Sequence, residues 1–243
     1  MNFNNILFLD IETVSQYETY NHVPEDWKEL WDLKAQFLIR NREEETYESV
    51  YHRAGIYAEF GKIICISCGC LQGTGTERKL LLKSYCGHDE KKLLLEFADM
   101  LQKWSGDSEK FLCAHNGKEF DYPYICRRMV INGIDIPEAL KIAGRKPWEI
   151  RHLDTMELWK FGDYKNYTSL KLLAKVLGIP SPKDDIDGSM VNSVYWIEKD
   201  IDRIVTYCQK DVITLTQVLL RFHCEHLIKP ENISIKYVRQ NQF

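Results

Sequence analysis

The sequence predicts an α/β fold in which a mixed five-stranded sheet is flanked by helices, with a helical insertion after the first strand. Five apolar segments have the length and composition of buried strands, two of them form a hairpin, and helical segments separate the later ones. A hairpin followed by alternating helices and strands gives a sheet with antiparallel and parallel pairs. At 243 residues the chain can form one large core, and we expect a single domain over residues 1–243.

The first strand is expected over residues 5–10, because this short segment is almost entirely apolar. Residues 17–58 then interrupt the strand pattern, and their sequence PEDWKELWDLKAQFLIRN has the acidic start and apolar spacing of a helix. We therefore interpret 17–58 as a helical insertion. The apolar segments 62–71 and 78–86 flank the turn sequence QGTGTE, which predicts that they are the second and third strands of a hairpin.

Helices and strands alternate in the rest of the chain. One helical segment is amphipathic with acids in its first turn, and a proline in the first turn marks the next. The expected elements are, in order, helix 89–104, strand 110–117, a helix from residue 121, strand 151–159, a helix ended by Gly178, a polar loop over 180–192 and a final helix over 196–226. Helical connections of this kind are typical of parallel strands.

Charge, hydropathy and cysteine content restrict the class of protein. The net charge of −4 argues against a broad basic surface for nucleic acid, but it leaves room for a local basic groove. No apolar run approaches the ~20 residues of a membrane span and no signal-peptide pattern opens the chain, so we expect a cytoplasmic protein without membrane contact. The cysteines of CISCGC, residues 65–70, lack a second pair to complete a zinc site.

Two acidic residues lie at the end of the first strand. In the sequence NNILFLDIET, Asp10 and Glu12 are separated by one residue and therefore point to the same face of a strand. Two carboxylates a few ångströms apart repel each other by roughly 1 kcal/mol in water and by ~4 kcal/mol at an intermediate dielectric. A D-x-E pair is common by chance, but this pair follows an apolar strand to the sheet edge at which α/β proteins bind ligands.

A second group of polar residues follows the fourth strand. The sequence AHNGKEFDYPYI contains Asn116, Phe120 and Asp121 in the spacing N-x-x-x-F-D, at another strand end and at the start of a helix. Asp121 is a candidate metal ligand, and helix capping is its alternative role. Asn116 and Phe120 are candidate substrate-binding residues, and their alternative roles are a turn former and a core aromatic.

A third group lies on the final helix. Tyr207 and Asp211 are four residues apart and project together from the edge of the apolar stripe of this helix. Together with Asp10, Glu12 and Asp121, Asp211 forms a set of four carboxylates. Four converging carboxylates would be unstable without cations, so the set predicts bound divalent metal. Oxygen ligands alone favour Mg²⁺ or Mn²⁺ over zinc.

Two similar sequences elsewhere in the chain lack this context. Asp107 and Glu109 repeat the D-x-E spacing in a polar stretch, which predicts a solvated loop. Tyr85 and Asp89 repeat the Y-x-x-x-D spacing, but Gly87 and the strand-to-helix turn between them prevent a common helical face. Neither pair is a candidate for the site.

In this order, D-x-E, N-x-x-x-F-D and Y-x-x-x-D resemble the three exonuclease motifs of the DnaQ-like (DEDD) superfamily, tyrosine subtype. The other subtype has histidine where this chain has Thr206. The chain looks most similar to stand-alone relatives of the proofreading exonuclease domain of family B DNA polymerases, which the sequences DIDGSMV (185–191) and EFGKIICIS (59–67) also resemble. The resemblance implies a ribonuclease H-like fold and an enzyme that removes nucleotides from 3′ ends.

The resemblance also implies a catalytic role for each motif residue. Two divalent cations, Mg²⁺ or Mn²⁺, would be bound, the first by Asp10, Glu12 and Asp211. Asp10 would also bind the second cation, together with Asp121. Tyr207 would orient the water that attacks the scissile phosphate.

Substrate contacts follow from the same resemblance. Glu12 would contact the terminal sugar hydroxyl, while Asn116 and Phe120 would position the last nucleotides. The expected substrate is DNA with single-stranded or frayed 3′ ends, and the expected partner is a polymerase or repair factor. Two alternatives stay open, namely a 3′→5′ exoribonuclease on the same scaffold and a catalytically idle nucleic-acid-binding module. The intact acids and tyrosine argue against the idle module.

Three weaker signals have competing explanations. The segment 141–152 combines basic residues with Trp148, which suits either contact with a single strand or a tryptophan that covers the core. The HCEH sequence, residues 223–226, suggests a metal site, but histidines near a helix end more often complement the helix dipole. His115 either lines the cleft or fills a packing site.

Overall fold

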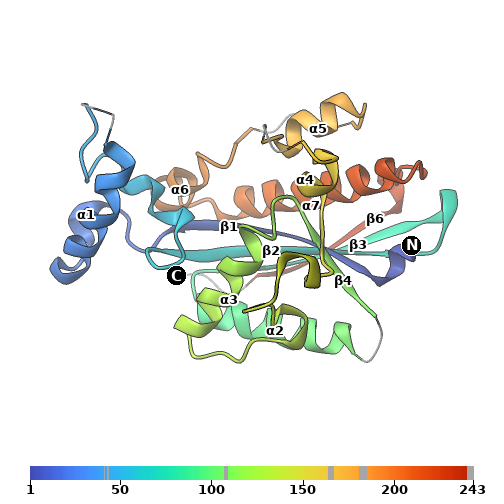
Figure 1. Cartoon of the computed structure of the whole chain (residues 1–243), viewed down its shortest axis with the longest axis horizontal. Coiled ribbons are helices and arrows are strands. Elements are labelled where there is room, and N and C mark those ends of the chain that lie inside the picture. Colours follow the sequence, from blue (N-terminus) through green and yellow to red (C-terminus); the bar gives the residue numbers. More distant parts are fainter. Residues whose placement is uncertain (41, 43, 107–108, 164–166, 181–184, 240–243) are drawn as a thin grey trace.

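The structure is a computed structural model that describes residues 1–40, 42, 44–106, 109–163, 167–180 and 185–239. Its centre is a six-stranded mixed sheet with the strand order β5-β4-β1-β2-β3-β6 (Figure 1). The strands are β1 (Ile6–Ser15), β2 (Gly61–Gln72), β3 (Lys79–Cys86), β4 (Phe111–Ala114), β5 (Leu153–Asp154) and β6 (Ile233–Arg239). β2 pairs antiparallel with β1 and β3, and the other three pairs are parallel. The predicted α/β class, mixed sheet and hairpin are confirmed.

Helices cover both faces of the sheet, with α2 and α3 on one face and α4 to α7 on the other (Figure 1). The helices are α1 (Glu25–Ile39), α2 (Glu90–Ser105), α3 (Asp121–Ile131), α4 (Thr155–Lys160), α5 (Leu170–Val176), α6 (Val191–Ser193) and α7 (Ile201–Phe222), with the 3-10 helix η3 at Tyr51–Ile56. Leu9 of β1 packs with Phe97 of α2, whereas its neighbour Phe8 packs with Val212 of α7. Odd-numbered residues of β1 thus face α2 and α3, and even-numbered ones face α7. Within the described residues, no helix has both the length and the apolar character needed to cross a membrane.

The segment between β1 and β2 contains α1 and η3 and lies at one end of the sheet (Figure 1). Its own small core surrounds the buried Trp31, whose Nε1 donates to the carbonyl of Tyr47 at 2.9 Å. η3 packs closely on β1, since a Cβ atom at Gly55 would lie 2.9 Å from the backbone of Val14. This glycine lets η3 approach the end of the strand that carries Asp10 and Glu12.

The predicted fifth strand over 151–159 is wrong for most of its length. β5 contains two residues, and α4 takes up the following six. The cause is Asp154, whose carboxylate accepts hydrogen bonds from the backbone N–H groups of Met156 and Glu157 and so starts a helix. A strong N-cap therefore overrides the apolar composition of this segment.

The predicted count of five strands is also wrong, because β6 pairs in parallel with β3 and makes a sixth. The final helix is shorter than the predicted 196–226. It begins after Lys199, which has a positive φ of 56°, and Asp200 caps it by accepting from the N–H of Arg203. It ends before Cys224, which has a φ of 55°. β1 runs beyond the predicted 5–10, because β2 pairs with it as far as Ser15.

The polar loop predicted over 180–192 is only partly described, since residues 181–184 lie outside the described residues. The short helix α6 begins inside its predicted range. Asp107 of the solvated D-x-E sequence also lies outside the described residues. The Tyr85 and Asp89 pair is separated as expected, since Tyr85 is buried in β3 and Asp89 caps α2.

Candidate active site

The candidate site begins with Asp10 and Glu12 on the face of β1 that α7 covers. They lie opposite Ser67 and Cys65 of β2, and a bulge in the strand pair follows Glu12. One side-chain oxygen of each acid and the Sγ atom of Cys208 on α7 lie within 4.8 Å of one another. The alternation of the strand therefore brings the two acids together as predicted.

Asp121 reaches this site from the turn that follows β4. The backbone turns at Asn116, which has a positive φ of 65°, and α3 begins at Asp121, with Phe120 as its N-cap residue. The N-cap role considered for Asp121 is therefore wrong. Its buried carboxylate instead accepts a hydrogen bond from the backbone N–H of Ile11, which lies between Asp10 and Glu12. This contact ties α3 to the end of β1.

Tyr207 and Asp211 lie one helical turn apart on α7, and both are half-buried. The phenol of Tyr207 forms a hydrogen bond with the Asp211 side chain. The apolar stripe beside them is buried, including Ile204, Cys208 and Val212. Both polar residues thus lie at the edge of the core as predicted, facing the acids of β1.

Among the described residues, the group whose ligand atoms lie within 4.8 Å of one another contains Asp10 and Glu12 but neither Asp121 nor Asp211, and these two acids act on the pair through their charge. Burial, together with the nearby Asp211 and Asp121 carboxylates, raises the pKa of Asp10 well above its usual value. Burial and the Asp10 carboxylate raise the pKa of Glu12 in the same way. For Asp121, burial raises the pKa to about 7, and the carboxylate of Asp154 and, to a smaller extent, that of Asp211 add to this shift. Each acid therefore makes it harder for the others to ionise.

The donor set fits a hard divalent cation. The Oδ2 atom of Asp10 is buried and has no hydrogen-bond partner, and neither Asp10, Glu12 nor Asp121 forms an ion pair with a basic side chain in the part of the chain that the structure describes. Burial raises the pKa of the Cys208 thiol well above its usual value, and this thiol donates to the carbonyl of Asp10. A protonated thiol is a poor metal ligand, so the carboxylate oxygens define the site.

Two residues that the sequence analysis missed hold the site in place. The buried Asp154 accepts from the backbone N–H groups of Asn116 and Lys118, at 2.9 and 3.1 Å, and so fixes the turn before α3. Asn192 accepts from the backbone N–H of Ser15 at 2.9 Å and so ties α6 to the end of β1. An available signal for Asp154 was its place before a helical segment, and for Asn192 its position directly after DIDGSMV.

A cleft of about 610 Å³ opens beside Glu12. It is lined by Ile11, Glu12, Thr13, Arg42, Glu45, His52, Arg53, Gly55, Ile56, Phe120, Gly188, Ser189 and Asn192. Phe120 is half-buried, because one side packs against the core and Tyr124 while the other faces the cleft. Both roles considered for Phe120 are therefore compatible with its position. Asn116 does not line this cleft, and its backbone conformation agrees with the turn-former role.

The weaker sequence signals lie away from this site. His115 is hydrogen-bonded on both ring nitrogens, to Thr155 Oγ1 and the carbonyl of Thr168, which agrees with a packing role. Among the described residues, neither CISCGC nor the 223–226 sequence forms a group of three metal-ligand side chains. Trp148 is 76% exposed, so the interpretation that it covers the core is wrong.

Comparison with known proteins places the chain in a family. A family model described as "Predicted 3'-5' exonuclease related to the exonuclease domain of PolB" matches residues 56–239, more than half of the chain. This range includes Asp121, Tyr207 and Asp211, whereas Asp10 and Glu12 precede it. No curated protein matches the chain.

Among solved structures, the chain is similar to the family B DNA polymerase from the hyperthermophilic archaeon Pyrobaculum calidifontis, with a TM-score of 0.51 and 15% sequence identity. The match covers 90% of this chain and 24% of the polymerase chain, so this chain spans about a quarter of that protein. At this identity the similarity concerns the fold, and it agrees with the ribonuclease H-like fold expected from the sequence. On the match to the family model, the chain belongs to the family of predicted 3′-5′ exonucleases related to the exonuclease domain of PolB.

Proposed function

We propose that this protein is a metal-dependent 3′→5′ exonuclease that hydrolyses the terminal phosphodiester bonds of DNA, preferably single-stranded DNA. One observation supports this above all: the buried Glu12 and Asp121 and the half-buried Asp10, all with raised pKa values, have no basic partner of their own among the described residues and are influenced by the charge of Asp211. Such a cluster is stable when divalent cations neutralise it. Membership of the exonuclease family supports the same reaction.

The four acids divide between two cation positions in this proposal. Asp10, Glu12 and Asp211 would hold the first Mg²⁺ or Mn²⁺ ion, and Asp10 and Asp121 the second. When bound, such ions supply an activated water and neutralise charge on the phosphate and the leaving oxygen. The Asp10 Oδ2 atom is buried and has no hydrogen-bond partner, so it would be available as a metal ligand.

The remaining residues position the water and the substrate. Tyr207, held by its hydrogen bond to Asp211, would orient the attacking water beside the acids. Phe120 would stack on a terminal base from its side of the cleft, and Glu12 would contact the terminal sugar hydroxyl. Asn116 would act on the last nucleotides through the turn that it forms before Phe120.

End-labelled oligonucleotides test this proposal directly. DNA and RNA strands of matched sequence are incubated with the protein in Mg²⁺, in Mn²⁺ or with a chelator. We expect stepwise shortening from the 3′ end of single-stranded DNA that the chelator abolishes. Preferential shortening of RNA would identify an exoribonuclease instead, and no hydrolysis of either strand would favour the idle binding module.

A circular single strand provides the matched control for the polarity of the reaction. A 3′→5′ exonuclease requires a free 3′ end, so the circular strand should remain intact under conditions that degrade the linear strand of the same sequence. Efficient cutting of the circle would contradict the proposal of an obligate exonuclease. It would still be compatible with a metal-dependent nuclease.

A further inference from the structure

The cleft beside Glu12 has one basic wall. Its basic side chains, Arg42, His52 and Arg53, all come from the 17–58 segment, of which Arg53 and His52 belong to η3. Two acids also line the cleft, Glu12 of the sheet and Glu45 of the 17–58 segment. Basic side chains beside Glu12 favour a phosphate of a strand that enters this cleft.

Arg53 is the basic residue of this wall that is available for a ligand. Arg42 Nη1 is paired with Glu45 Oε1 at 2.8 Å, and His52 Nδ1 is 2.8 Å from the carbonyl of Ser49. Arg53 is half-buried, and its side chain forms no hydrogen bond or ion pair with the residues that the structure describes. A guanidinium held in a cleft without a partner is suited to bind a phosphate group.

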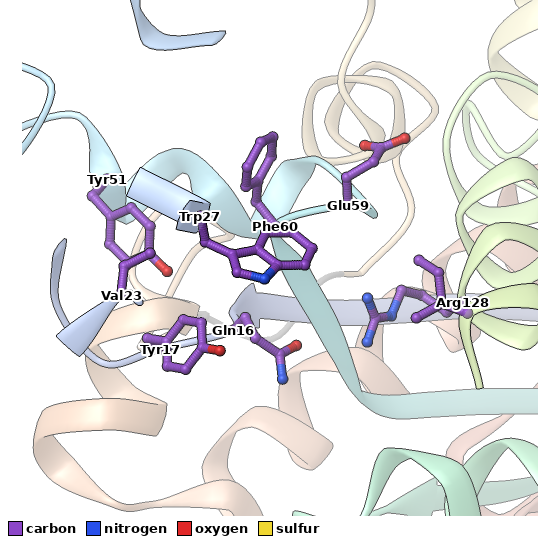
Figure 2. A pocket seen from close by; sticks show the side chains of 9 residues that line it. Gln16, Tyr17, Val23, Trp27, Tyr51, Glu59, Phe60 and Arg128 are labelled. Carbon is purple, nitrogen blue, oxygen red and sulfur yellow. The ribbon is translucent and has the colours of Figure 1, made fainter. Parts of the chain in front are cut away.

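A second pocket, of about 380 Å³, lies between the 17–58 segment and the end of β1 (Figure 2). Its walls include the aromatic rings of Tyr17, Trp27, Tyr51 and Phe60, with the Trp27 and Phe60 rings 6.1 Å apart. Trp27 contacts Phe60 at the side of the aromatic cluster around Trp31 and is itself 40% exposed, so part of its ring is open. Open aromatic faces are suited to stacking with a planar ring.

The polar groups of this aromatic pocket favour an uncharged base over a phosphate. The buried Arg128 is fully paired, through two bonds to Glu90 and one to the carbonyl of Ala58. Gln16 and Glu59 are exposed, and their side chains form no hydrogen bond or ion pair within the described part of the chain. A carboxylate beside a free amide would repel a phosphate but can accept hydrogen bonds from the edge of a base.

The cleft and the aromatic pocket are adjacent along two elements. β1 contributes Glu12 to the cleft, and Gln16, the residue directly after β1, lines the pocket roughly 13 Å farther at the usual rise of a strand. η3 contributes Tyr51 to the pocket and Arg53 to the cleft. A single strand can therefore contact both places at once.

We infer that the 17–58 segment binds the substrate strand, with Arg53 on a backbone phosphate and the aromatic pocket on a base. The inference rests on the proposed function for the identity of the ligand, a single-stranded nucleic acid. It assigns a role to a segment of which almost all precedes the matched family range, 56–239.

Fluorescence anisotropy with a labelled single-stranded DNA, in the presence of a chelator, tests this inference whether or not the protein hydrolyses the strand. We expect Trp27→Ala to weaken binding by about 5- to 150-fold, the usual effect of one lost stacking contact. We expect Arg53→Gln to weaken binding and to reduce the slope of log K against log salt by about 0.7, as one lost phosphate contact does.

Matched controls separate these effects from those of removing any positive charge or any aromatic ring from the protein. Arg127→Gln, on the exposed side of α3, and Phe37→Ala, 76% exposed on α1 outside the pocket, should bind as the wild type does. Trp27→Phe and Arg53→Lys should retain most of the affinity, and thermal melting of each variant verifies its fold. The wild type should bind a strand with abasic 3′-terminal positions more weakly than the intact strand. Trp27→Ala should bind the abasic and the intact strand with equal affinity.

Each outcome decides part of the inference. Wild-type affinity in both Trp27→Ala and Arg53→Gln, or no binding by the wild type, would overturn it. A loss confined to Arg53→Gln would overturn the base site, and a loss confined to Trp27→Ala would overturn the phosphate contact. If the wild type binds through both residues yet never hydrolyses a strand in Mg²⁺, the proposed function fails while this inference stands.

Discussion

Two groups of acids in the described part of the protein, one around Glu90 and one at the candidate active site, differ in their surroundings. Glu90, at the start of α2, accepts two hydrogen bonds from Arg128, one from the backbone N–H of Ile63 and one from Asn132. The candidate active site gathers four acids, and its Asp10 retains a buried oxygen without a partner. The first arrangement is complete within the protein, and we propose that cations complete the second. This contrast distinguishes a structural acid from a metal-binding one.

The sharpest test of the contrast removes one acid of the cluster. Asp10→Asn should reduce Mg²⁺-dependent hydrolysis on the order of 10³-fold or more, because both cation positions lose a ligand. The metal-free variant should be at least as stable as the wild type, because a repelling charge is gone. Single-turnover kinetics and urea unfolding measure the two effects. Asp99→Asn, at an exposed acid paired with Lys103, is the control; unchanged turnover in Asp10→Asn would contradict the metal role.

Breaking the other acidic site should have the opposite consequences. Arg128→Met leaves Glu90 buried without its cation, which typically costs about 3–5 kcal/mol of unfolding free energy. Urea unfolding measures this loss, with the exposed neighbour Arg127→Met as a control that should change stability by less than about 0.5 kcal/mol. A loss below about 1 kcal/mol would contradict a structural role for the Glu90–Arg128 pair.

The pH dependence of stability should reveal the cluster in the metal-free protein. Burial raises the pKa of Asp121 to about 7 and raises the pKa values of Asp10 and Glu12 well above their usual range, from unfolded values of about 4. The folded state therefore binds more protons, and its extra stability is present below pH 4 and lost as the pH rises through 7. Unfolding free energy should fall by on the order of 3 kcal/mol across this range. Saturating Mg²⁺ should reduce the fall, and a metal-free curve that rises between pH 5 and 7 would contradict the arrangement.

The smallest effect is expected from the residue that orients water. Tyr207→Phe removes the hydroxyl that bonds to Asp211, and it should lower turnover by about 10²-fold while binding of the strand stays unchanged. Kinetics and anisotropy on the same oligonucleotide measure the two quantities. Tyr195→Phe, which loses a hydroxyl bonded to His88 outside the cleft, is the control. Weaker binding with normal turnover would contradict the water-orienting role.

Sequence reasoning succeeded where local geometry decides the position of a side chain. Asp10 and Glu12 share a face because strands alternate, and Tyr207 and Asp211 share a side because helices turn every 3.6 residues. The order of strands and helices then placed Asp121 near them. These placements need no knowledge of long-range contacts beyond the meeting of strand ends at one edge of a sheet.

The features that could not be predicted depend on distant contacts. β6 lies at the sheet edge, and its pairing with β3 joins residues about 150 positions apart, which no local pattern indicates. The basic wall of the cleft exists because η3 packs on β1, so the proximity of Arg53 to Glu12 follows from tertiary structure alone. Asp154 shows the same limit at short range, since its capping bonds replaced a predicted strand with a helix.

The most direct test of the account is a crystal of the protein soaked in Mn²⁺ and measured for anomalous scattering. The account predicts anomalous peaks between the carboxylates of Asp10, Glu12, Asp121 and Asp211, and no peak at the Glu90–Arg128 pair. Peaks absent from the four acids, or acids that point to separate places, would contradict it.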